Sequence, residues 1–173
     1  HVPDEPLADL EPLPQSGYVR IAAGAAVAIV DVARIGPDYL PGHAHADTLS
    51  FELSLAGRRV LVNGGTSTYE AGAERQRERG TAMHDTVMVD GEDSSEVWGS
   101  FRVARRARPF DVGWGRDASG ALWVEAAHDG YQRLPARVVH RRRWELGQQG
   151  LRVVDAVEGR FRQAIARFRF APG

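Results

Sequence analysis

The chain has 173 residues, of which 43% are hydrophobic and 26% charged, as expected for a globular domain with a packed core. The net charge is −1, and no apolar run approaches the length of a membrane span, so neither nucleic acid nor a membrane is expected as a partner. Cysteine is absent, which excludes disulfides and thiolate metal sites.

The first 17 residues are rich in proline and acidic side chains, and we interpret them as a linker or an extended arm. Residues 18–173 are then expected to form one domain. The chain begins with His1 and carries no visible signal peptide, so we interpret it as a fragment of a longer protein.

Short segments with strand patterns, separated by turn residues, dominate residues 18–173. Leu49, Phe51, Leu53 and Leu55 alternate with polar residues, which predicts a half-buried strand, and residues 60–62 are expected to return as its hairpin partner. Further strands are predicted in segments 27–32, 86–90, 101–104, 122–126, 138–144, 151–157 and 165–170. The only helix-like stretch is residues 71–79. The pattern predicts an all-β fold, an antiparallel β-sandwich of roughly 8–12 strands with very little helix.

Two histidines and an aspartate stand directly before the strand that starts near Leu49. In an extended backbone, His43, His45 and Asp47 would project to one side, where imidazole and carboxylate groups suit zinc. The hairpin is expected to bring Asn63 back close to His45, and His84 precedes the next strand. The alternative is that these histidines are loop residues hydrogen-bonded to the backbone.

Three ordered sequence blocks carry a family resemblance. They are GHAHADTLSFEL at residues 42–53, LVNGGT at 61–66, and TAMHDTVMVDG at 81–91, with Tyr69 and Arg79 between the last two. Together they resemble the signature region of the heparinase II/III-like polysaccharide lyases. The resemblance covers about fifty residues and is specific for the family, but it does not specify a substrate.

The resemblance implies a domain arrangement and a set of site residues. The family sandwich packs against an N-terminal α/α toroid, so the protein's own toroid is an expected partner. His43 would face the cleft between the two domains as a catalytic residue, and His45, Asn63 and His84 would bind a structural zinc ion. The family commonly has Asp at the position of Asn63, and a neutral amide is the weaker ligand.

The implied reaction is β-elimination on an acidic polysaccharide that contains uronic acid. A base removes the proton next to the uronate carboxyl, and an acid protonates the departing glycosidic oxygen. Most of the catalytic groups would come from the toroid, so the isolated fragment is expected to be inactive. The resemblance also suggests a periplasmic or secreted protein.

Tyr69, Arg75 and Arg79 are predicted to bind the substrate, because an aromatic ring can stack on a sugar and a guanidinium can bind its acidic groups. The alternative for Tyr69 is core packing or a loop anchor, and the alternative for the arginines is a solvated loop whose glutamates offset the charge. The arginines within residues 102–108 and 141–143 are interpreted as solvent-exposed charges that protect strands from aggregation.

Two other functions stay open at this level. One is a non-catalytic glycan-binding or scaffolding sandwich with a metal-braced loop, which the departures at Asn63 and Asp85 favour. The other is a zinc hydrolase that uses His43, His45 and Asp47 directly.

Overall fold

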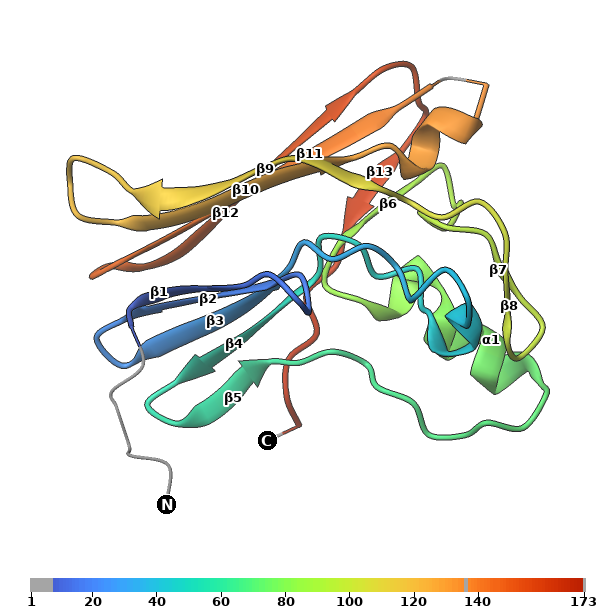
Figure 1. Ribbon diagram of the computed structural model, residues 1–173, viewed down its shortest axis with the longest axis horizontal. Coiled ribbons are helices and arrows are strands. Elements are labelled where there is room, and N and C mark those ends of the chain that lie inside the picture. The colour runs from blue at the N-terminus through green and yellow to red at the C-terminus, as the bar shows by residue number, and fades with distance from the viewer. Residues whose placement is uncertain (1–7, 136, 173) are drawn as a thin grey trace.

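The computed structural model describes residues 8–135 and 137–172, which form an antiparallel β-sandwich (Figure 1). One layer has the strand order β1-β2-β3-β4-β5, and the other has the order β12-β11-β10-β9. The first sheet contains β1 (Leu10–Leu13), β2 (Tyr18–Ala23), β3 (Ala26–Asp31), β4 (Phe51–Leu55) and β5 (Arg58–Leu61). The second contains β9 (Pro109–Arg116), β10 (Leu122–His128), β11 (Val139–Gly147) and β12 (Gly150–Glu158).

Two short strand pairs and four short helices complete the described structure. The pairs are β6 (Val87–Val89) with β13 (Ala164–Ala166), and β7 (Val97–Trp98) with β8 (Arg102–Val103). The helices are α1 (Ala73–Arg79) and the 3-10 turns η1 (Pro41–His43), η2 (Thr81–Met83) and η3 (Gly130–Arg133). Figure 1 shows α1 and the β7–β8 pair together at one end of the sandwich. No helix within the described ranges is long and apolar enough to cross a membrane.

The core lies between the two sheets because alternate residues of the central strands point inward. In β11 every second side chain is buried, including Trp144, whose ring contacts Phe51 of the opposite sheet edge to face at 6.2 Å. Buried members of the same cluster are Val19, Ile21, Ala28, Val30, Leu49, Leu122, Val124, Ala126 and Leu146. This packing joins the layers and leaves the loops at one end free to form a site.

The all-β prediction is confirmed, with more strands than expected, since the described residues contain thirteen. The predicted linker is wrong for residues 10–13, which form β1 and pair antiparallel with β2. Pro12 is tolerated there because β1 is an edge strand and can lack one backbone donor. Residues 1–7 of the predicted linker lie outside the described residues.

The sequence pattern also missed β9, whose glycines weaken any strand signal. Gly113 and Gly115 lie under the ring of Trp123, and a Cβ atom on Gly115 would stand 3.1 Å from that ring. Close cross-strand packing against Trp123 therefore favours glycine at position 115, which local sequence does not show.

Candidate functional site

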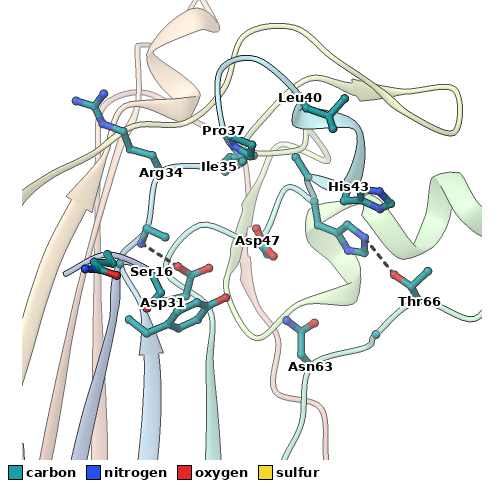
Figure 2. A pocket seen from close by; sticks show the side chains of 18 of the residues that line it. Ser16, Asp31, Arg34, Ile35, Pro37, Leu40, His43, Asp47, Asn63 and Thr66 are labelled. Atoms are coloured by element: carbon teal, nitrogen blue, oxygen red, sulfur yellow. Dashed lines mark hydrogen bonds between the residues drawn. The ribbon is translucent and has the colours of Figure 1, made fainter. Parts of the chain in front are cut away.

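A hollow of about 820 Å³ opens at one end of the first sheet. Its wall is formed by the β1–β2 turn, the segment after β3, the turn η1 and the segment after β5. Figure 2 shows His43, Asp47, Asn63 and Thr66 around this hollow, so the motif residues separated by up to about twenty positions in sequence meet there.

The local backbone separates the two histidines of the motif. His43 ends the 3-10 turn η1, which starts at Pro41, and the chain becomes extended again at Ala44. His43 is exposed whereas His45 is half-buried, so the expected extended presentation of the motif on one side does not form. The motif therefore offers one accessible imidazole and one that faces inward.

His43 belongs to an exposed aromatic group. Its ring lies edge to face against Tyr69, with 5.5 Å between the centroids, and against Phe101, with 6.2 Å. Tyr69 and Phe101 are 58% and 47% exposed and lie nearly parallel to each other. The structure thus brings together the predicted catalytic and substrate-binding residues His43 and Tyr69. Phe101 was missed because the sequence places it simply at the start of a strand.

The three predicted metal ligands also come together. The ring centroids of His45 and His84 are 5.2 Å apart, and His84 Nδ1 lies 2.6 Å from Asn63 Oδ1. Burial, together with nearby arginine charges, lowers the pKa of His45 to about 4. Burial and the neighbouring His45 lower the pKa of His84 to about 3. Both lowered pKa values favour neutral imidazoles at pH 7, each with one nitrogen that can accept a hydrogen bond or bind a metal.

This arrangement does not fit a zinc ion. His84 Nε2 is buried without a hydrogen-bond partner in the described residues, as a metal ligand would be. However, the Arg75 guanidinium lies 3.1 Å from His45 Nε2, and the neutral Asn63 oxygen already accepts from His84. Within the described ranges, no group of three His, Cys, Asp or Glu side chains could hold a metal ion. Zinc binding by His45, Asn63 and His84 stays a prediction.

Arg75 and Arg79 of α1 are fully buried, which argues against the direct substrate contact predicted for them. Arg75 donates to His45 Nε2, to the Thr66 hydroxyl and to the Ser100 carbonyl. Arg79 donates to the carbonyls of Ala44, Gly99 and Arg102, at 2.9 to 3.0 Å. Both arginines therefore hold the histidine segment and the β7–β8 turn in place.

Two carboxyl groups on the wall of the hollow were not predicted as a pair. Burial raises the pKa of Asp47 to about 7, and burial together with the Asp47 charge raises the pKa of Asp31. Asp31 also accepts a hydrogen bond from the Ala33 backbone N–H at 2.8 Å. Burial and the charge of the neighbouring carboxylate therefore both favour the protonated form of these groups. Sequence shows Asp31 only as the end of a strand.

The comparisons with known proteins agree on one family. The family model described as "Heparinase II/III-like, C-terminal" matches residues 5–173. No protein of curated function matches the chain in sequence.

Solved structures of heparinases share the fold. The heparinase III product of the gene BT4657 has a TM-score of 0.71 and 18% identity, with 100% of this chain and 25% of that chain covered. Another heparinase III has a TM-score of 0.68 and 21% identity, with 95% of this chain and 25% of that one covered. The heparan sulfate lyase HepC from Pedobacter heparinus has a TM-score of 0.65 and 21% identity, with 89% of this chain and 23% of that chain covered. The chain thus spans about a quarter of the length of these structures.

Proposed function

Because the chain belongs to the heparinase II/III-like C-terminal family, we propose that it forms one wall of the active-site cleft of a polysaccharide lyase. The substrate would be an acidic glycan that contains uronic acid, and the reaction would be β-elimination. The observation that carries this proposal is the exposed His43 imidazole, which lies with Tyr69 and Phe101 beside the 820 Å³ hollow.

The reaction needs a base, an acid and a group that stabilises negative charge. The base takes the proton from the carbon that bears the carboxyl group, and that electron pair forms a carbon–carbon double bond. The bond to the glycosidic oxygen breaks at the adjacent carbon, and the acid protonates that oxygen. Stabilisation of the enolate that develops at the carboxyl group lowers the barrier.

In this proposal, His43 is the group of this chain that takes part in these steps. Its side chain is exposed, whereas His45 and His84 have lowered pKa values and face inward. An accessible imidazole can transfer a proton or donate a hydrogen bond to the substrate carboxylate. Tyr69 and Phe101 offer ring faces on which a sugar can stack, and the buried Arg75 and Arg79 position them. The remaining catalytic groups would come from the toroid in the complete lyase.

The test is His43→Ala in the complete lyase, with product followed by the ultraviolet absorbance of the new double bond. Loss of a proton-transferring or carboxylate-binding group should lower kcat/KM by roughly 10²-fold or more, with an unchanged melting temperature. Arg58→Ala, at the exposed start of β5, is the matched control and should retain activity. Wild-type activity in the His43 variant would show that the proposed role is wrong.

A non-catalytic glycan-binding domain is the second candidate, favoured by the exposed rings of Tyr69 and Phe101. The same assay separates the two. If the complete wild-type protein binds a uronate glycan but releases no unsaturated product, the binding function holds and the lyase function fails.

A further inference from the structure

A second, smaller hollow of about 280 Å³ adjoins the first one. Four arginines line it, namely Arg34, Arg105, Arg106 and Arg108, and the only acidic side chain in its lining is Asp38. Arg34 and Ile35 line both hollows, so this short segment is a wall that the two hollows share. The smaller hollow therefore lies next to the larger one, which His43 lines.

The floor of the smaller hollow is rigid. Arg106 donates to the Ile35 carbonyl at 3.1 Å and forms an ion pair with Asp38. Ile35 packs in one buried cluster with Ala44, which lies between the two motif histidines, and with Ala107. The arginine hollow is thus tied directly to the segment that carries His43.

The rim carries uncompensated positive charge. Arg105 is paired with Glu96, and Arg106 with Asp38. In the described part of the chain no carboxylate lies within ion-pair distance of Arg34 or Arg108, and both side chains are exposed. Figure 2 shows the Arg34 guanidinium directed away from His43 and Asn63. The guanidinium group matches the geometry of the oxygens of carboxylate and sulfate groups. The chain contains arginine but no lysine.

We propose that this arginine hollow is a subsite that binds an oxyanion, a sulfate or a carboxylate, on a sugar unit next to the one that reacts. The proposal rests on the proposed function for its ligand, an acidic glycan. Arg34 and Arg108 bind the anion, whereas Arg106 holds the floor. Arg105, Arg106 and Arg108 belong to the cluster that is interpreted from the sequence as solvent-exposed charge, and the proposal gives part of this cluster a binding role.

The test is the double variant Arg34→Gln/Arg108→Gln of the complete lyase. With a heparan-type hexasaccharide, KM should rise about five- to tenfold while kcat stays unchanged, because the subsite binds ground state and transition state alike. The matched control is Arg58→Gln/Arg152→Gln, which removes the same charge at exposed positions outside the hollow. An increase in KM no larger than in the control, or a fall in kcat at constant KM, would overturn the proposal.

Desulfated and carboxyl-reduced hexasaccharides identify the bound group. If sulfate is the ligand, the double variant and the wild type should bind the desulfated sugar equally, and if carboxylate is the ligand, they should bind the carboxyl-reduced sugar equally. Direct binding by calorimetry keeps this test independent of turnover. A wild type without lyase activity whose binding still depends on Arg34 and Arg108 would refute the proposed function but support the subsite. Equal binding of all the sugars by wild type and variant would refute the subsite.

Discussion

Asn63 contributes an amide oxygen beside the neighbouring imidazoles of His45 and His84. Its amide oxygen accepts a hydrogen bond from His84 Nδ1, which leaves His84 Nε2 with a buried lone pair and no partner in the described residues. His45 Nε2 must accept from Arg75, since an arginine can only donate. Two neutral imidazoles, an amide and a guanidinium form a site that is short of negative charge for a divalent cation.

Asn63→Asp should therefore raise zinc affinity by roughly tenfold or more, because a carboxylate supplies the missing anionic ligand. The measurement is a zinc titration by calorimetry of wild type and variant at pH 7.5. Asn63→Asp/His84→Ala is the control and should lose the gain. Equal affinities for wild type and Asn63→Asp would show that the imidazoles do not form a metal site even with a carboxylate beside them.

At the scale of the element, the short helix α1 holds the loops of the candidate site in place through hydrogen bonds. Its Arg79 donates to the carbonyl groups of three residues that lie 35, 20 and 23 positions away from it. The helix has only seven residues and no side-chain cap, so its own hydrogen bonds cannot maintain it. Buried contacts to the surrounding loops must stabilise it instead.

Arg79→Met should destabilise the fold by about 3 kcal/mol or more, because it leaves buried carbonyls without donors. Urea denaturation of the variant measures this loss. The control is Arg77→Met in the same helix, whose exposed side chain pairs only with Glu74, and it should leave stability unchanged. Equal stability of the two variants would mean that the Arg79 hydrogen bonds contribute nothing measurable.

At the scale of the whole molecule, a buried polar chain connects the second sheet to the site. The Gly130 N–H donates to His128 Nδ1, so His128 Nε2 carries the proton that faces His140 Nδ1, and His140 Nε2 then donates to Asp155. Arg142 of β11 also binds Asp155, and its other nitrogen donates to the carbonyls of Leu49 and Asp85.

These last two contacts cross from one layer to the other. Leu49 has a positive φ of 63° and directly follows the histidine motif, while Asp85 follows His84. From the opposite sheet, Arg142 therefore holds the strained segment at Leu49 and the bend at Asp85 in place. The position of the candidate site depends on how the two layers pack.

This polar chain predicts how stability depends on pH. Burial and the neighbouring His140 lower the pKa of His128, and burial lowers that of His140. Below the unfolded value of about 6.5 the unfolded chain binds protons that the folded chain does not, so stability falls as pH decreases from there. The slope is up to about 1.4 kcal/mol per pH unit for each histidine.

His128→Gln should reduce this slope, because glutamine takes up no proton. Urea midpoints of wild type and variant between pH 7.5 and pH 4.5 measure the difference. The comparison cancels other groups, including His45 and His84, which have lowered pKa values, and Asp47, whose raised pKa acts in the opposite direction. Parallel pH profiles would show that His128 takes up its proton over the same pH range in the folded and the unfolded state.

The sequence by itself was enough to predict the layered all-β fold and the family. The alternation around Phe51 and the strand pattern within β11 follow directly from burial on one face of a sheet, which is a local property. The meeting of His45, Asn63 and His84 was also predictable, because a hairpin returns the chain to its starting point and the family resemblance supplied the third residue.

Only the tertiary structure decided which of these residues are accessible. Arg75 and Arg79 lie in a segment whose composition suits a substrate-binding loop. Both side chains are nevertheless buried and donate hydrogen bonds to carbonyl groups of distant residues. No local sequence pattern predicts those acceptors. Phe101 contacts His43, and Arg34 and Arg108 line one hollow, although these segments are far apart in the chain. Strand periodicity depends on neighbours in sequence, whereas exposure and charge pairing depend on neighbours in space.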